Sequence, residues 1–279
     1  DHSYDVDRTP SYAMPFADHL NASCCSRDTL RSLQDMGYAV VCWTTEVTGS
    51  VPAKPPKVIT GISSATEAAT SSFTRPVHEC MRLTLSLEEE SHVFALTGAR
   101  EALRAYDIVA VAPASELILE RVLQSPVSDA IDIVCFPSAH RPPFNLRPAL
   151  ARRVLSAGMF FELCYSAALR DSSSRRHFVS NLQAMLEVLP KGSKRGTTGL
   201  LLSSGADEAR LLRTPYDALA LVGAFGCGRE VAKLALADNH FKIFERAARR
   251  QVAASGALPP AAGLHSLGPL PCAAAAALL

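Results

Sequence analysis

Apolar and polar positions along the chain follow two periods, one typical of strands and one typical of helices. Short apolar runs with few charges predict buried strands, and the longer stretches between them have the apolar spacing of amphipathic helices. The predicted strands cover residues 12–18, 38–43, 79–87, 107–112, 131–136, 159–164 and 198–203. The predicted helices cover residues 26–36, 88–106, 115–123, 147–157, 174–189, 215–225 and 229–250.

Most of these strands are apolar throughout, which predicts a parallel sheet that is covered on both faces. The regular repetition of strand and helix favours an α/β fold, a TIM-like β/α barrel of about seven parallel strands, slightly fewer than the usual eight. An open, doubly wound sheet is the alternative. It is less favoured because no strand is followed by a glycine-rich turn of the dinucleotide-binding pattern.

Two segments depart from this regular pattern. Residues 44–76 are rich in Ser, Thr and Pro, which predicts a long mobile insertion. Residues 253–279 are of low complexity, which predicts a disordered tail. The sequence therefore predicts a single barrel domain over residues 1–252, with the insertion inside it and the tail after it.

Charge is distributed unevenly although the net charge of the 279 residues is only +1. Residues 1–140 contain about ten Lys and Arg against about eighteen Asp and Glu, and residues 141–250 contain about eighteen basic against about nine acidic residues. An acidic partner is therefore expected to bind the second half. An ordinary mixed surface, on which the halves neutralise each other, is the alternative.

The eight cysteines do not form the spacing of a disulfide framework or of a zinc site, since no C-x-x-C pair occurs. Cys42, Cys80, Cys135 and Cys164 lie in or beside apolar runs, as small buried residues do. This usage favours a reducing, intracellular compartment. No apolar run is long enough to span a bilayer, so we expect no membrane partner.

Any metal site is expected at the ends of the predicted strands, because functional groups of β/α barrels gather there. Asp18 and His19 follow the first strand, but the other strand ends add only His140 and Asp207. A working site needs three or more such groups to converge. We therefore expect no metal, no other cofactor and no catalytic residue, and a metal-dependent phosphoesterase on the same barrel is the alternative function.

Arginines gather where strands give way to helices. Arg170, Arg175 and Arg176 surround the start of the helix at residues 174–189, where they oppose the helix dipole, so stability alone does not favour them. A bound anion such as phosphate would resolve the conflict. Pairing of one arginine with Asp171, with the others in solvent, is the alternative.

Further groups at strand ends suit an anion. Ser203, Ser204 and Gly205 form a turn that can offer hydroxyl and backbone donors, although Ser-Gly pairs are common in ordinary turns. The other arginines near predicted turns are Arg141, Arg147 and Arg213.

Taken together, these segments resemble the thirty-kilodalton protein subunit family of ribonuclease P and the related MRP particle. The resemblance spans roughly residues 12–250, and the block that starts at Phe160 is its most specific part. The matching pieces are RLTLSL from Arg82, LRAYDIVAVAP from Leu103, IDIVCF from Ile131, RPPFNLRP from Arg141, FFELCYSAALRDSSSRRHFVSN from Phe160, LLLSSGA from Leu200 and LRTPYDALALVGAFG from Leu212.

The resemblance implies a PHP-domain-like barrel without the metal ligands of its enzyme relatives. It also implies a subunit that does not cut RNA itself, because the RNA of the particle removes the 5′ leader of precursor tRNA. The expected partners are the ribonuclease P or MRP RNA, precursor tRNA indirectly, and other particle proteins including a small Pop-five-type subunit. The expected location is the nucleus, in particular the nucleolus, with a role in tRNA or rRNA processing.

On this interpretation the basic residues neutralise RNA phosphates and the serine turn adds donors. A protein–protein scaffold, whose arginines meet acidic protein surfaces instead, stays open beside it. The insertion and the tail depart from the family pattern, and the segment PFADHL from Pro15 matches it only loosely. The predicted RNA-binding residues are Arg141, Arg147, Arg170, Arg175, Arg176, Ser203, Ser204, Gly205 and Arg213.

Overall fold

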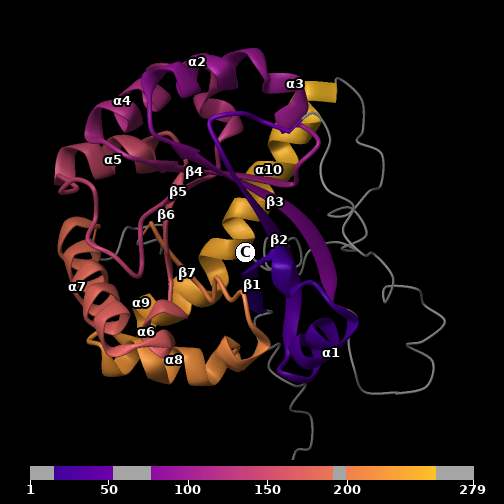
Figure 1. The fold of residues 1–279 in the computed structure, drawn as a ribbon, viewed down its shortest axis with the longest axis vertical. Coiled ribbons are helices and arrows are strands. Elements are labelled where there is room, and N and C mark those ends of the chain that lie inside the picture. Colours follow the sequence, from indigo (N-terminus) through magenta and orange to yellow (C-terminus); the bar gives the residue numbers. More distant parts are fainter. Residues whose placement is uncertain (1–15, 53–76, 191–198, 256–279) are drawn as a thin grey trace, which may run out of the picture.

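Seven parallel strands form one sheet in chain order in the computed structural model, which describes residues 16–52, 77–190 and 199–255 (Figure 1). Each strand pairs with the next one along the chain, as repeated strand–helix units require. The strands are β1 (Phe16–Asn21), β2 (Tyr38–Thr48), β3 (His78–Leu87), β4 (Ile108–Pro113), β5 (Ile133–Cys135), β6 (Phe160–Cys164) and β7 (Leu200–Ser203).

The first strand meets the end of the last one, which closes the sheet into a barrel. Leu20 forms a parallel bridge with Ala206, and the Asn21 N–H donates to the Ala206 carbonyl at 2.9 Å. The Gly205 N–H donates to the His19 carbonyl at 2.8 Å. The prediction of a TIM-like β/α barrel with about seven parallel strands is thus confirmed.

Helices surround the barrel, and side chains cap several of them. Ser26, Ser115, Asp171 and Thr214 each accept a backbone N–H of the first turn, which satisfies otherwise unpaired donors. The α-helices are α1 (Arg27–Asp35), α2 (Glu90–Gly98), α3 (Arg100–Leu103), α4 (Glu116–Gln124), α5 (Pro148–Ser156), α6 (Ala167–Arg170), α7 (Ser172–Val188), α8 (Pro215–Ala224), α9 (Arg229–Lys233) and α10 (Asn239–Ser255). Shorter helical segments are η1 (Ala22–Cys24), η3 (Pro126–Ala130), η4 (Ala209–Leu211) and the π-helical η5 (Leu234–Asp238).

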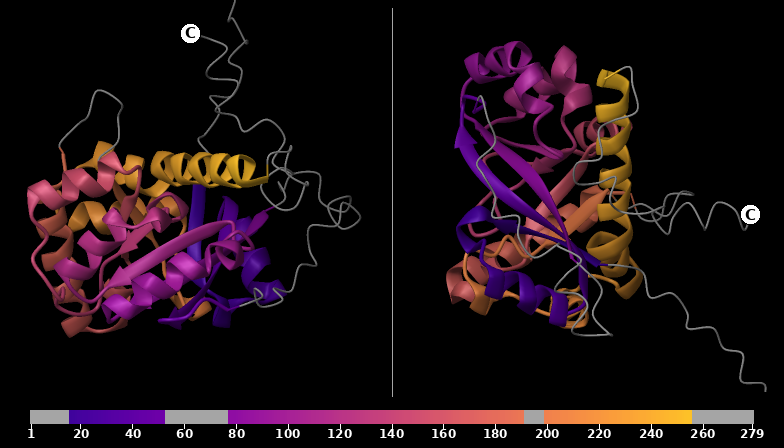
Figure 2. Two further views of the ribbon diagram at one scale, coloured as in Figure 1. Left: turned by 90° about the horizontal axis from the view of Figure 1, so that it is seen from above. Right: turned by 90° about the vertical axis from the view of Figure 1, so that its right-hand side faces the viewer.

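Helix α10 crosses the end of the barrel where the strands begin (Figure 2). Phe241, Ile243 and Phe244 are buried there against inward-facing residues of the strands, such as Val40 and Ile133. This apolar layer closes the barrel from below. The carboxyl ends of the strands lie at the opposite end, which faces the viewer in Figure 1.

Several predicted boundaries were wrong, among them the end of the first strand, which lies at Asn21 rather than at residue 18. The strand predicted to end at Trp43 continues to Thr48, because residues 44–48 pair with β3; the predicted insertion at residues 44–76 therefore begins inside the sheet. The helix predicted over residues 88–106 divides into α2 and α3 at Gly98 and Ala99, since glycine disfavours a helix interior. Helix α10 reaches Ser255, into the predicted tail at residues 253–279.

Parts of the domain prediction lie outside the described residues. These parts are residues 1–15, residues 53–76 of the predicted insertion, residues 191–198, and residues 256–279 of the predicted tail. Within the described ranges, no helix combines the length and the apolar character that a bilayer crossing requires.

Candidate functional site: the centre and the mouth of the barrel

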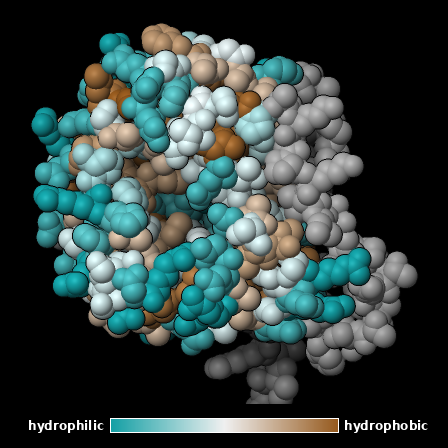
Figure 3. Space-filling model, viewed as in Figure 1, coloured by the Kyte–Doolittle hydropathy of each residue, from teal (hydrophilic) through white to brown (hydrophobic). Residues whose placement is uncertain are grey.

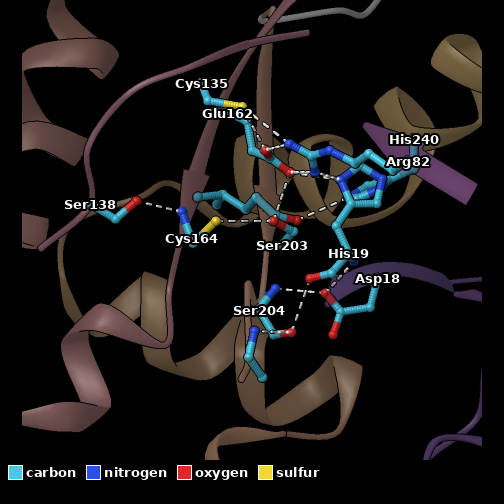
Figure 4. A network of polar contacts seen from close by, with 12 residues as sticks. Asp18, His19, Arg82, Cys135, Ser138, Glu162, Cys164, Ser203, Ser204 and His240 are labelled. Carbon is cyan, nitrogen blue, oxygen red and sulfur yellow. Dashed lines mark hydrogen bonds and ion pairs between the residues drawn. The ribbon is translucent and has the colours of Figure 1, made fainter. Parts of the chain in front are cut away.

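Two residues of opposite charge meet inside the barrel, one from β3 and one from β6 (Figure 4). The Arg82 Nη1 donates to Glu162 Oε1 at 2.7 Å, and Nη2 donates to Oε2 through a second short contact. Both side chains are almost fully buried, at 3% and 1% exposure. A two-pronged guanidinium–carboxylate contact of this kind is among the strong hydrogen-bonded pairs in proteins.

Side chains from three further strands complete the polar centre. His19 of β1 lies with Nδ1 2.7 Å from Glu162 Oε1, and the Ser203 hydroxyl donates to the same oxygen at 2.8 Å. The Cys135 thiol lies 3.3 Å from Glu162 Oε2. Strands β1, β3, β5, β6 and β7 thus all direct polar groups to one point, because alternate residues of each strand face the interior.

The charges at the centre of the barrel compensate each other. Burial alone would raise the pKa of Glu162, but the Arg82 guanidinium, with His19, holds that pKa well below its usual range. Burial, aided by the neighbouring Arg82, lowers the pKa of His19 and keeps its ring neutral. The guanidinium therefore supplies the positive charge at the centre of the barrel. Across the described ranges, no three His, Cys, Asp or Glu side chains are arranged to hold a metal ion.

The metal candidates seen in the sequence do not come together. Asp18 adjoins His19 but turns away from Glu162, accepting the Ser204 N–H at 2.6 Å and the His19 N–H at 2.9 Å. Asp207 pairs with Arg170 on the outside. His140 is exposed at the mouth of the barrel.

Asp18 itself is a buried carboxyl group with one oxygen, Oδ2, that has no hydrogen-bond partner in the structure. Burial raises its pKa to about 7, although the Ser204 backbone bond lowers it. Near neutral pH the group is therefore divided between its protonated and ionised forms.

The serine turn does not offer its hydroxyl groups to an anion, so this part of the predicted site was wrong. Ser203 and Ser204 are buried at 1% and 0% exposure. The Ser203 hydroxyl is bound to Glu162, and the Ser204 hydroxyl points to the His19 carbonyl at 3.4 Å. Gly205 lies higher, at the mouth, with a φ of +57° that favours glycine.

Five of the predicted arginines lie in the loops that follow β5 and β6, at the same end of the barrel. Arg175 and Arg176 are exposed in the first turn of α7, and Arg141 is exposed in the loop after β5. None of the three takes part in an ion pair within the described ranges. Arg170 pairs with Asp207 at 2.7 Å, and the exposed Arg147 lies 3.9 Å from Glu116.

Arg213 lies apart from this group. Its Nη1 donates to the carbonyls of Arg210 and Leu212, and the Tyr38 hydroxyl donates to its own carbonyl at 2.9 Å. The same hydroxyl lies 3.5 Å from the hydroxyl of Tyr165, which follows β6, so the Arg213 backbone lies near that turn. Of the six predicted arginines, only Arg141 and Arg170 line the cleft at the mouth; Arg147, Arg175, Arg176 and Arg213 lie outside its lining.

A cleft of about 650 Å³ opens at the mouth of the barrel. Figure 3 shows this face of the molecule, hollowed near its centre and surrounded by hydrophilic residues. Arg82 and Glu162 line the cleft from below, Arg141 and Arg170 line the side of β5 and β6, and Glu46 and Glu88 line the side of β2 and β3. The acidic and basic halves of the sequence thus meet across this cleft.

The sequence did contain a signal for the central pair. Glu162 is the only charged residue of β6, Arg82 lies between apolar neighbours in β3, and a buried charge is stable only when it is paired. A charge inside an apolar run therefore predicts that a partner exists, without saying which residue supplies it. The sequence pattern alone did not show that the side chains of Arg82 and Glu162 would face the same interior.

Fold and site together define a class: β/α barrels whose centre is filled by an internal guanidinium–carboxylate pair and whose basic groups lie on the loops at the mouth. The family model for the RNase P subunit p30 matches residues 21–252. The chain therefore belongs to the RNase P subunit p30 family, and the resemblance seen in the sequence is confirmed.

Individual relatives agree with this assignment. The ribonuclease P protein subunit p30 of Mus musculus is 29% identical over 179 residues, which cover 64% of this chain and 63% of that protein. The ribonuclease P/MRP protein subunit RPP1 of Saccharomyces cerevisiae is 28% identical over 157 residues, which cover 56% of this chain and 50% of that protein. The chain thus spans less than two thirds of the length of these relatives.

A solved structure shares the fold. A chain in the cryo-EM structure of archaeal ribonuclease P with mature tRNA superposes with a TM-score of 0.57 at 15% sequence identity. The match covers 84% of this chain and 91% of that chain. At this identity the likeness concerns the fold, and it supports the barrel assignment.

Proposed function

We propose that this protein is a non-catalytic, RNA-binding subunit of the ribonuclease P or MRP ribonucleoprotein. In this role it supports removal of the 5′ leader from precursor tRNA, or rRNA processing, while the RNA of the particle performs the hydrolysis. Family membership supports the assignment to the particle. The surface of the barrel supports the RNA-binding role.

The observation that carries this role is the set of arginines at the mouth that have no carboxylate partner. The loops at residues 136–147, 165–176 and 204–213 contain seven arginines but only three acidic residues. Arg141, Arg175 and Arg176 are exposed and free of ion pairs within the described ranges, so they remain available to phosphates. Contacts of this type bind the backbone of RNA and carry little sequence information.

The proposal extends to partners and location. We propose that the protein assembles with the particle RNA and with other particle proteins, among them a small Pop-five-type subunit, and meets precursor tRNA indirectly. We also propose a nuclear, and in particular nucleolar, location. Both proposals rest on the family and on the chemistry expected of such a subunit.

Replacement of Arg175 and Arg176 by alanine tests the RNA-binding role. The double variant should bind the particle RNA more weakly, and its logarithmic dependence of affinity on salt should become shallower by about one to two units, since each phosphate contact contributes roughly one. Binding is measured by filter retention between low and physiological salt. The charge-matched control is Arg152→Ala with Arg153→Ala on α5, which should leave the slope nearly unchanged.

Two outcomes would contradict the proposal. An unchanged salt slope in the Arg175 and Arg176 variant would show that the mouth does not contact phosphates. An equal loss in the control variant would show that net charge, rather than this surface, determines the affinity.

A further inference from the structure

The cleft at the mouth has walls that suit the flat face of an aromatic ring. Ala112, Pro113, Phe136, Pro137 and Ala139 line it from β4, β5 and the loops that follow. These side chains are short or rigid, so they leave an open apolar slot between the polar rims. Unstacked bases bind to proteins through apolar and aromatic surfaces of this kind.

The two rims of the cleft carry opposite charge. Arg141 and Arg170 lie on the side of β5 and β6, and Glu46 and Glu88 lie on the side of β2 and β3. Neither glutamate takes part in an ion pair among the described residues. A purely anionic ligand would be repelled by this acidic rim. A nucleotide fits better, because it has a phosphate at one end and N–H donors on the edge of its base at the other.

The floor of the cleft contains a polar group without a hydrogen-bond partner in the structure. Thr84 faces the cleft from β3, is 7% exposed, and its buried Oγ1 has no hydrogen-bond partner in the structure. Leaving a buried hydroxyl group unpaired costs free energy, and a polar atom of a bound base would remove that cost. Beneath it, Arg82 and Glu162 neutralise each other, so the floor is polar without net charge.

We infer that this cleft accepts a single unstacked nucleotide of an RNA strand. The phosphate lies against Arg141, beside the Arg170–Asp207 ion pair. The base enters between the apolar walls, and its amino group donates to Glu46 or Glu88. This inference rests on the proposed RNA-binding function and adds to it a pocket for one base. Bases that carry an exocyclic amino group, namely adenine, cytosine and guanine, are favoured over uracil.

The test compares single-stranded hexamers of adenosine, cytidine and uridine with a hairpin duplex, measured by fluorescence anisotropy on the full chain. Ala112→Leu fills the slot, and Thr84→Val removes the floor hydroxyl while keeping the side-chain shape. Ala112→Leu should weaken binding of the adenosine and cytidine hexamers about tenfold, because the stacking of one base is lost. Binding of the duplex should not change, because its bases stay paired. Ala105→Leu, an exposed site at the other end of the barrel, is the matched control.

The acidic rim has its own test. Glu46→Gln with Glu88→Gln should reduce the preference for cytidine over uridine, whereas a general electrostatic effect would raise both affinities in equal proportion. For the wild-type chain, the methyl NMR signals of Ala112 and Ala139 should shift on addition of the cytidine hexamer. This measurement does not depend on the stability of any variant.

The inference is overturned if Ala112→Leu binds every single strand as tightly as the wild type, or if the alanine methyl signals do not move at saturating RNA. Free cytidine monophosphate should compete with the cytidine hexamer for the cleft. If it binds and the hexamer does not displace it, the inference is also overturned. Loss of all RNA binding in the Arg175 and Arg176 variant, with the effect of Ala112→Leu absent, would leave the proposed function standing and reject only the nucleotide pocket.

Discussion

At the scale of single residues, the centre of the barrel depends on the pairing of one guanidinium with one carboxylate. Arg82 and Glu162 are buried together, with Ser203 and His19 completing the bonds of the carboxylate. Such a pair contributes little net stability compared with apolar residues, but removal of one partner leaves an uncompensated charge. The two residues should therefore behave very differently when they are changed singly and together.

Replacement of Arg82 by methionine should lower the free energy of unfolding by ~3–5 kcal/mol, because Glu162 then stays buried without its partner. The double variant Arg82→Met with Glu162→Gln should recover a large part of this loss. Urea unfolding of the two variants and the wild type gives the comparison. Equal destabilisation of both variants would show that packing, rather than charge, determines the effect.

Asp18 gives the protein a pH dependence of the opposite sign to that of an ordinary paired carboxylate. Burial raises its pKa to about 7 from the ordinary 3.8, so the folded state holds an extra proton between these values. Stability should therefore fall as pH rises from ~4 to ~7, by on the order of 4 kcal/mol for this group alone. Asp18→Asn should flatten that slope and stabilise the protein at pH 7–8, as urea unfolding at several pH values would measure. An unchanged slope would show that Asp18 is ionised throughout.

At the scale of elements, the closure of the barrel depends on the short turn after β7. Gly205 donates to the His19 carbonyl, which connects β7 to β1, and it lies close to Cys164 at the end of β6. A Cβ at this position would lie 2.6 Å from the Cys164 Cβ and Sγ. Strain of the backbone and a steric clash therefore coincide at one residue.

Gly205→Ala should be more destabilising than Gly37→Ala, and thermal unfolding would measure both. Each glycine has a positive φ, +57° and +90°, where a side chain costs ~1–2 kcal/mol. At Gly37 a Cβ would meet nothing within 4 Å, so this variant measures the backbone effect alone. Similar losses at both sites would contradict a tight contact between the turn and β6.

The strands show which parts of the fold local sequence patterns could predict. Apolar runs located six of the strands within a few residues, because burial on both faces removes polar residues from them. The pattern failed at residues 44–48, where Thr, Glu and Val form an extension of β2 with polar side chains. Residues 44–48 resemble a loop in composition, because polar and apolar side chains alternate there. Their pairing with β3 cannot be recognised from the local sequence.

At the scale of the whole molecule, the uneven charge of the sequence becomes an uneven charge in space. Because the strands follow chain order around the barrel, Glu46 and Glu88 of the acidic half lie across the mouth from Arg141 and Arg170 of the basic half. The conflict of Arg175 and Arg176 with the helix dipole was visible in the sequence, because both lie near the start of a predicted helix. The orientation of the Ser203 and Ser204 hydroxyl groups could not be predicted, since a turn sequence does not say which side faces the interior.

The partner of Arg82 was likewise out of reach of local patterns, because Glu162 is 80 residues away along the chain. Only closure of the barrel brings the two strands to a common interior. The topology of the fold decides long-range pairing of this kind, and the preferences of single residues do not predict it.

The apolar layer that α10 forms beneath the strands makes the barrel a blind recess rather than a tunnel. A polymer cannot thread through it, so whatever enters from the mouth must leave by the same opening. A nucleotide inserted as inferred above would therefore have both of its chain neighbours outside the mouth. Dissociation would then require no sliding of the strand through the barrel.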